Sequence, residues 1–201
     1  MLRVGLTGGL ATGKSFVGAC LSELGCHLIQ ADLLGHEVLL PDGEAYPAVA
    51  AEFGPGILRA DRAIDRKLLA ADVFGRPERL ARLNSLVHPH IFQRQEELVS
   101  QYSAADPTGI VVIEAAIMIE AGSHKRCQRL IVVVCSEEQQ IARAMKRDGA
   151  TREEVLARLG MQMPLAEKLK FADYVIDTTG GKEHTREQTR KVYESLRSIR
   201  L

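Results

Sequence analysis

Residues 5–16 read GLTGGLATGKSF and combine residue types that hold phosphate groups. The Gly8-x-x-x-x-Gly13-Lys14-Ser15 core has the spacing of a Walker A loop, or P-loop. Glycines allow backbone N–H groups to converge on an anion, and the N-terminus of a following helix adds the positive end of its dipole. We therefore expect Lys14 to reach the β- and γ-phosphates of a nucleoside triphosphate and the Ser15 hydroxyl to ligate Mg²⁺.

Two carboxylates follow apolar segments that look like buried strands. Asp32 comes after residues 27–30, and Glu114 ends residues 110–114. Ligands of open parallel sheets bind beyond the carboxyl ends of the strands, so both side chains can serve the phosphate site. Asp32 either caps a helix that starts at Leu33 or orients and deprotonates an acceptor hydroxyl, and these roles are compatible. Glu114 either steadies Mg²⁺, usually through water, or is a strand-end glutamate in solvent.

A pair of arginines, Arg143 and Arg147, lies one helical turn apart in the segment EEQQIARAMKRDG. We find no acid within helical reach on that face, and like charges at this spacing destabilise an isolated helix by about 0.2–0.5 kcal/mol. An anion bound between them would account for the pair, because guanidinium groups suit phosphoryl oxygens. We therefore predict that at least one of them contacts phosphate, whereas Arg158 has Glu154 one turn earlier as an ordinary partner.

His88-Pro89 lies inside a long amphipathic stretch at 77–102. Proline disfavours helical geometry at the preceding residue and lacks a backbone donor, so we expect the helix to break or kink there. Such a break either turns the His88 side chain out of the helical register or leaves it as the cap of a second helix with Pro89 at its first position. His90 forms a His-x-His pair with His88, but with no third ligand nearby we do not expect a metal.

The elements that must position these residues can be read from the pattern of apolar residues. A short apolar run precedes the glycine loop and a helix-length segment at 13–24 follows it, which is the context that the motif needs and argues against a chance glycine-rich turn. Alternating strands and helices predict an α/β fold of three layers, with a mostly parallel sheet covered on both faces. The five expected strands are residues 2–6, 27–30, 110–114, 130–135 and 174–177.

The interval between the second and third expected strands is too long for one crossover helix. It predicts a helical insertion that can hold a second substrate. After the fourth strand, residues 137–148 and 151–163 predict two helices hinged at Gly149-Ala150. The last segment carries apolar residues at helical spacing and predicts a helix packed on the sheet.

Composition excludes several classes of protein. The 201 residues contain 26 basic and 26 acidic side chains, so we expect no broad electrostatic attraction to nucleic acid or membrane. The four cysteines form no C-x-x-C pair and are expected to be reduced core thiols of a cytoplasmic protein. The N-terminus lacks the apolar stretch of a signal peptide, and the longest apolar runs are strand-length.

P-loops also occur in regulatory GTPases, which carry an Asn/Thr-Lys-x-Asp motif that reads guanine. The sole asparagine, Asn84, is followed by serine, and the chain has no Thr-Lys pair. A GTP switch is therefore disfavoured. The helical insertion and the arginine-bearing helical pair favour a kinase that closes over two substrates, because closure excludes water as a phosphoryl acceptor.

Several stretches resemble the dephospho-CoA kinase family from end to end. They are GLTGGLATGKS, ADLLGHEV, LNSLVHPHI and QIARAMKRDGATREEVLARLGMQMPLAEKLKFADYVIDTTG. The resemblance implies transfer of the γ-phosphate of ATP to the ribose 3′-hydroxyl of dephospho-CoA, with ATP and Mg²⁺ as cofactors. It also implies a P-loop fold like that of nucleoside monophosphate kinases, with a core at 1–32, 106–136 and 172–201, a CoA-binding insertion at 33–105 and a lid at 137–171.

The resemblance also assigns roles to individual residues. Asp32 is the expected base, and the other expected catalytic residues are Lys14, Arg143 and Arg147. The residues expected to bind ATP are Gly8, Gly9, Leu10, Ala11, Thr12, Gly13, Lys14, Ser15 and Phe16. The residues expected to bind dephospho-CoA are Thr7, Asp32, His36 and His88. The expected Mg²⁺ ligands are Ser15 and Glu114.

The chain departs from the family pattern at a few positions. Gln30 replaces the first acid of an Asp-Ala-Asp run, and Glu114 and Ala116 replace an aspartate and a proline after the third strand. Thr178 stands where asparagine is frequent near the adenine. None of these changes touches Lys14, Ser15 or Asp32, so we expect an active enzyme.

The expected partner is dephospho-CoA, with no nucleic acid and no membrane, and the chain is expected to act as a monomer or small homo-oligomer. Two alternatives remain open at this point. Another small-molecule kinase, such as a nucleoside monophosphate kinase, would share the P-loop and lid and differ mainly in the insertion. A non-catalytic ATP-binding regulator would share only the loop.

Overall fold

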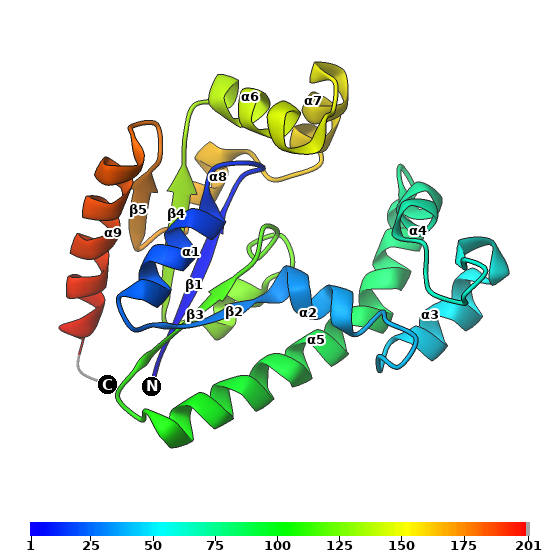
Figure 1. The fold of residues 1–201 in the computed structure, drawn as a ribbon, viewed down its shortest axis with the longest axis horizontal. Helices are drawn as coiled ribbons and strands as arrows, with labels where there is room; N and C mark the ends of the chain where they lie inside the picture. The colour runs from blue at the N-terminus through cyan, green and yellow to red at the C-terminus, as the bar shows by residue number, and fades with distance from the viewer. Residues whose placement is uncertain (200–201) are drawn as a thin grey trace. The chain divides into compact units, whose positions relative to one another are not determined.

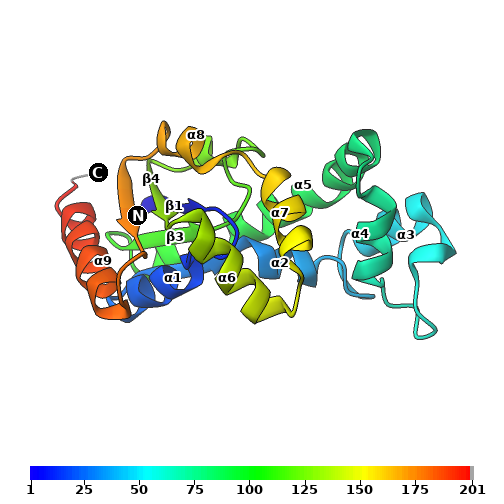
Figure 2. The same ribbon diagram turned by 90° about the horizontal axis from the view of Figure 1, so that it is seen from above.

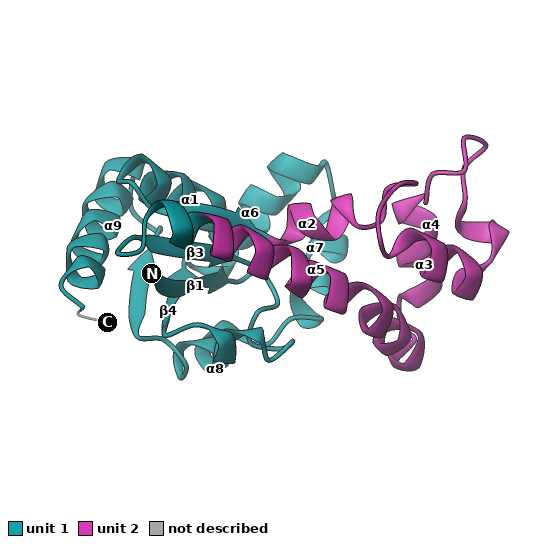
Figure 3. Cartoon of the chain, turned by 90° about the horizontal axis from the view of Figure 1, so that it is seen from below, with its two compact units in different colours: residues 1–30, 102–201 teal, residues 31–101 magenta. Residues whose placement is uncertain are grey.

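The computed structural model describes residues 1–199, so the last two residues of the expected core segment 172–201 lie outside it. The chain consists of two compact units, which Figure 3 colours separately. The larger unit comprises Met1–Gln30 and Tyr102–Leu201, and the smaller unit comprises Ala31–Gln101.

The larger unit is built on a five-stranded sheet with the order β2-β3-β1-β4-β5. Every pairing between neighbouring strands is parallel, so the expected mostly parallel sheet is fully parallel over the described residues. Three strands have the expected bounds, whereas β1 runs two residues further into the glycine loop and β4 is shifted by one residue. The strands are β1 (Leu2–Gly8), β2 (His27–Gln30), β3 (Ile110–Glu114), β4 (Arg129–Val134) and β5 (Tyr174–Asp177).

Helices cover both faces of this sheet, as the alternating pattern predicts. Figure 2 shows α1 (Lys14–Glu23) and α9 (Lys182–Arg197) on one side of the strands and α8 (Leu165–Leu169) on the other. Apolar side chains from β1, β3 and β4 form one core cluster with side chains from α1 and α9. The near-continuous apolar runs of the strands are typical of a parallel sheet that is buried on both faces.

Two helices, α6 (Glu137–Asp148) and α7 (Arg152–Gly160), lie beyond the carboxyl ends of β1 and β4 (Figure 1). Gly149 ends α6 with a left-handed φ of 64°, and the Thr151 side chain begins α7 by accepting a hydrogen bond from the backbone N–H of Glu154. These caps explain the expected hinge. Leu10 of the glycine loop packs with buried residues of both helices, namely Ile141, Ala144 and Val155.

The smaller unit is helical. It contains α2 (Ala31–Glu37), α3 (Tyr46–Phe53), the 3₁₀ turn η1 (Pro55–Ile57), α4 (Arg66–Val73) and most of α5 (Pro77–Ala105). These elements share a core that includes Val49, Ile57 and Leu69. A second 3₁₀ turn, η2 (Ser123–Arg126), belongs to the larger unit.

Of the break or kink expected at His88-Pro89, the break is wrong, because α5 continues through Pro89. Leu83 and Val87 before the proline and Ile91 after it pack into the same core cluster. This packing outweighs the loss of one backbone hydrogen bond, and His88 therefore stays in helical register. Its ring contacts that of Phe92 one turn later, with 5.7 Å between the ring centroids.

All four cysteines are free thiols, and three of them are buried, namely Cys20, Cys26 and Cys135. Burial raises the pKa of Cys26 to about 12 and that of Cys127 to about 11. These thiols stay protonated at neutral pH and are poor nucleophiles. Over residues 1–199, no helix is both long enough and apolar enough to cross a bilayer.

Candidate active site

The glycine loop connects β1 to α1, and its two motif glycines are required for different reasons. Gly13 caps α1 in the left-handed conformation with a φ of 92°, which side chains rarely adopt. Gly8 is required by space, because a Cβ there would lie 2.5 Å from the carbonyl oxygen of Val133. The motif spacing therefore matches a strand–loop–helix turn whose helix N-terminus faces the loop, the arrangement that binds anions.

Inside the loop, hydrogen bonds converge on the carbonyl oxygen of Gly9. The backbone N–H of Thr12 donates to it at 3.4 Å and the Thr12 hydroxyl at 3.0 Å. The Lys14 ammonium also donates to it, at 3.4 Å. The loop is thus folded back on itself, with its lysine held over the same turn.

Glu114, at the end of β3, is buried, with 5% of its surface exposed, so the alternative of a glutamate in solvent is wrong. Its Oε1 accepts a hydrogen bond from the Ser15 hydroxyl at 2.7 Å, and its Oε2 accepts one from Gln30 Nε2 at 3.2 Å. The carboxylate therefore meets the motif serine directly. A hydroxyl and a carboxylate oxygen in contact are the type of ligands that Mg²⁺ takes from proteins.

Thr178, which follows β5, joins the loop to α6. Its hydroxyl donates to the carbonyl oxygen of Thr12 at 2.6 Å. Arg143 donates to the same hydroxyl at 2.9 Å and to the Thr178 carbonyl oxygen at 2.7 Å. The Thr178 side chain therefore links Arg143 to Thr12 of the glycine loop.

Arg147 does not lack an acid, so that expectation is wrong. Its guanidinium forms two hydrogen bonds with the carboxylate of Asp148, the next residue, at 2.7 and 3.0 Å. Arg158 also pairs with Asp148, at 2.6 Å, and not with Glu154. The Glu154 carboxylate instead accepts the backbone N–H of Thr151 at the start of α7. Helical spacing missed these ion pairs because Arg147 contacts the next residue in the chain, and Arg158 reaches Asp148 from α7.

The other predicted site residues lie in two places. Thr7 is buried in β1 and its hydroxyl donates to the carbonyl oxygen of Ala116 at 3.3 Å. Asp32, His36 and His88 belong to the smaller unit. Asp32 lies in the first turn of α2, which begins at Ala31, so it is not the cap of a helix starting at Leu33.

His36 and His88 differ in their surroundings. His36 is exposed, and its Nδ1 accepts a hydrogen bond from Arg66 at 3.1 Å. Partial burial, reinforced by the Arg66 charge, lowers the pKa of His36. Burial likewise lowers the pKa of His88. Both rings are therefore favoured in the neutral form at neutral pH.

Sequence reasoning missed two polar residues that touch the glycine loop. Lys168 of α8 is fully buried, and its ammonium donates to the carbonyl oxygen of Gly8 at 3.4 Å. The Gln162 side chain accepts the backbone N–H of Leu10 at 2.9 Å. A lysine in a short polar helix normally lies in solvent, so the sequence carries no signal for this burial.

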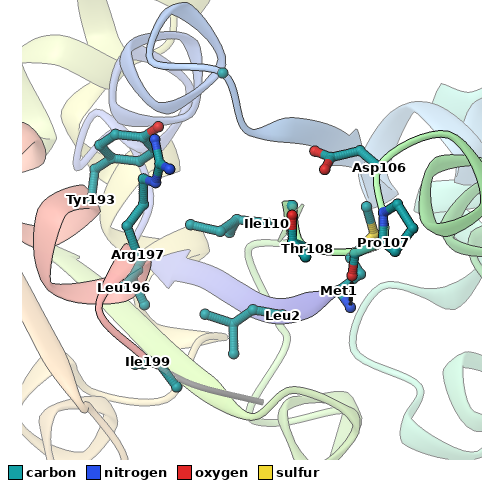
Figure 4. Close-up of a pocket in the computed structure, with 12 residues that line it drawn as sticks. Met1, Leu2, Asp106, Pro107, Thr108, Ile110, Tyr193, Leu196, Arg197 and Ile199 are labelled. Carbon is teal, nitrogen blue, oxygen red and sulfur yellow. Dashed lines mark hydrogen bonds between the residues drawn. The ribbon is translucent and has the colours of Figure 1, made fainter.

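A cavity of about 740 Å³ lies at the amino ends of β1 and β3, the opposite end of the sheet from Ser15 and Glu114 (Figure 4). Its lining includes Asp106, Tyr193 and Arg197. No residue of the glycine loop lines it. Over the described residues, no group of three or more His, Cys, Asp or Glu side chains is arranged to hold a metal ion.

A Walker A loop between a central parallel strand and a helix places the chain among P-loop nucleotide-binding proteins. A model of the dephospho-CoA kinase family matches residues 2–184. A dephospho-CoA kinase of Carboxydothermus hydrogenoformans is 42% identical over 187 residues, covering 92% of this chain and 89% of that protein. The chain belongs to the dephospho-CoA kinase family.

Solved structures agree with this assignment. A protein of Thermus thermophilus superposes with a TM-score of 0.85 at 32% identity, covering 97% of each chain. The dephospho-CoA kinase of Campylobacter jejuni superposes with a TM-score of 0.68 at 28% identity, covering 96% of each chain. The prediction of a dephospho-CoA kinase with a P-loop α/β fold is therefore confirmed.

Proposed function

We propose that this chain transfers the γ-phosphate of ATP to the ribose 3′-hydroxyl of dephospho-CoA and so forms coenzyme A. The observation that supports this most directly is the Walker A loop with its serine in contact with the buried Glu114 carboxylate. Membership of the dephospho-CoA kinase family supplies the acceptor.

In this proposal, residues 8–16 hold the phosphates of ATP. The backbone N–H groups at the start of α1 and the Lys14 ammonium neutralise the β- and γ-phosphates. Ser15 and Glu114 would hold Mg²⁺, and their paired oxygens fit such an ion. When bound, Mg²⁺ would neutralise the negative charge that develops on the phosphates.

We assign the base to Asp32, which would accept the proton of the acceptor hydroxyl as the phosphoryl group transfers. Thr7, His36 and His88 would bind dephospho-CoA, with the insertion at 33–105 holding its pantetheine arm. Arg143 and Arg147 would contact the transferring group from the lid at 137–171. Catalysis then rests on positioning and on neutralisation of charge.

The test is incubation of the purified protein with Mg·ATP and dephospho-CoA, with products followed by mass spectrometry beside a panel of adenylate and nucleosides. Multiple-turnover formation of coenzyme A, with no comparable product from the panel, is the expected result. Phosphorylation of a panel member while dephospho-CoA stays unmodified would overturn the proposed acceptor. Location of the new phosphate on another hydroxyl would overturn the 3′ assignment.

A further inference from the structure

Lys168 is the one lysine that the structure buries completely among the described residues. It lies on α8, in the segment that connects α7 to β5. Its ammonium meets three oxygens, the carbonyls of Gly8 at 3.4 Å and Ala116 at 2.8 Å and the Glu120 carboxylate at 2.9 Å. A buried ammonium is costly unless paired, and three acceptors match its three N–H donors.

These contacts orient the first peptide of the glycine loop. A trans peptide bond holds its C=O and N–H antiparallel, so fixing the Gly8 carbonyl also fixes the direction of the Gly9 N–H. The next carbonyl, that of Gly9, accepts hydrogen bonds from Thr12 and Lys14. The Lys168 contact at the Gly8 carbonyl and the Lys14 contact at the Gly9 carbonyl therefore lie on consecutive peptide groups of the loop.

A second residue of the same connecting segment holds the loop two residues further on. The Gln162 side chain accepts the backbone N–H of Leu10 at 2.9 Å. Glu120 ties the arrangement together, because its Oε1 accepts the backbone N–H of Met163 at 3.0 Å as well as the Lys168 ammonium. We call Lys168 and Gln162 the loop clamp.

We infer that Lys168 is a positioning residue that presets the glycine loop for the phosphates of ATP, with Gln162 as the weaker half of the loop clamp. This inference deepens the proposed function and rests on it, because it assumes that ATP binds at this loop. Lys168 touches backbone oxygens and Glu120, so it acts through the loop and not on the reacting atoms. Because the clamp residues belong to the segment after α7, the shape of the loop depends on how that segment is seated.

The test compares variants that keep or remove the ammonium while controlling for the charge that it balances. Lys168→Met combined with Glu120→Gln removes the ion pair as a whole, so that the Glu120 carboxylate is not left without its cation. Lys168→Arg keeps a cation with several donors. Lys170→Met is the matched control, because Lys170 pairs with Glu167 at the surface only two residues away. Gln162→Leu removes the second half of the clamp.

For each variant we would measure the Kd of Mg·ATP by calorimetry, kcat, the KM of both substrates, and the melting temperature. We expect the double variant to bind ATP about 10-fold more weakly and to lose roughly 10²-fold in kcat, with the KM of dephospho-CoA within about twofold of wild type. Lys168→Arg should recover most of the ATP affinity, and Lys170→Met should match the wild type. Gln162→Leu should weaken ATP binding about threefold.

A folded double variant with the Kd and kcat of the wild type would overturn the inference, and so would a lower melting temperature with an unchanged ATP Kd. If the double variant does not fold, Gln162→Leu decides, and an unchanged Kd for that variant overturns the clamp. Failure of the wild type to bind ATP would instead overturn the proposed function beneath it.

Discussion

The two ends of the parallel sheet differ in what they bury. At the carboxyl end, buried polar side chains cross-link segments that are far apart in sequence. They are Thr7, Glu114, Lys168 and Thr178. At the amino end, Leu2 and Ile110 are buried beside a cavity with Asp106, Tyr193 and Arg197 on its lining. Buried polar groups destabilise a fold unless they are paired. Their concentration at the carboxyl end of the sheet therefore indicates a functional site there.

The comparison predicts that substitutions tied to the carboxyl end change turnover most. Asp32→Asn should lower kcat by roughly 10²–10⁴-fold, the usual contribution of a general base, and leave the Kd of ATP nearly unchanged. Steady-state kinetics with dephospho-CoA, beside a nucleotide titration, measures both quantities. Near-normal turnover would remove the base assignment and leave Asp32 as a residue of the first turn of α2.

Lys14→Ala should reduce kcat by roughly 10²–10³-fold, because it removes a cation aimed at the phosphates. Unlike Asp32→Asn, it should also weaken ATP binding, since the same ammonium serves the ground state. Calorimetric titration with Mg·ATP distinguishes the two variants. An unchanged ATP affinity and rate would contradict the role given to the glycine loop.

The two arginines of α6, Arg143 and Arg147, should differ in their effect on kcat. Arg143→Ala removes two hydrogen bonds to Thr178, which itself bonds to the loop residue Thr12, and should lower kcat about 10-fold to 100-fold. Arg147→Ala should have the smaller effect in this pair, because its guanidinium is engaged by Asp148. Parallel kcat measurements decide, and a larger loss for Arg147→Ala would mean that Arg147 leaves Asp148 when substrates bind.

Asp148→Asn should act on stability and only weakly on turnover. Hydrogen bonds from Arg147 and Arg158 hold the pKa of Asp148 well below its ordinary value of 3.8. A carboxylate with a lowered pKa stabilises the fold above pH 3.8 and loses that contribution as pH falls toward its folded-state pKa. The free energy of unfolding of the variant at pH 7 should therefore be lower than that of the wild type by roughly 1 kcal/mol at most, because the ion pairs are partly exposed. Denaturant unfolding of both proteins at pH 7 and in acid measures the difference, which should shrink in acid.

The smallest effect is expected at the amino end of the sheet. Asp106→Asn weakens the contact between Asp106 and His27 Nε2, which are 3.3 Å apart and both partly exposed. Such a pair contributes about 0–1 kcal/mol, so the melting temperature should fall slightly while kcat stays within about twofold. A loss of turnover comparable to that of the arginine variants would show that the two ends are coupled.

Much of the fold could be predicted because its signals are local. Strands such as His27–Gln30 and Ile110–Glu114 are short apolar runs between turns, and Gly149 and Thr151 end and begin helices through their own backbone and side chains. The errors arise where distant residues decide. Packing on both sides of Pro89 keeps α5 continuous against the local preference of proline.

The site divides in the same way. Glycine spacing in the Walker A motif is a local signal, and so is an acid at the end of a strand. The burial of Glu114 and its contact with Ser15 depend on the pairing of β1 with β3, which the sequence suggests only in outline. Lys168 has no local signal at all, because its acceptors at Gly8 and Ala116 are 160 and 52 residues away. Lys168 becomes a buried residue only when these distant segments pack together in the folded chain.

The strand order has a consequence for the order of events during synthesis. β1 is synthesised before its parallel neighbours β3 and β4 (Figure 1), and its pairing with β4 extends to Val133 of that strand. The supports of the glycine loop at Lys168 and Thr178 emerge later still. Non-local pairing of this kind slows folding, and the apolar β1 has no paired strand until β3, at Ile110–Glu114, has been synthesised. The glycine loop is therefore synthesised well before Lys168 and Thr178, the residues whose side chains support its shape.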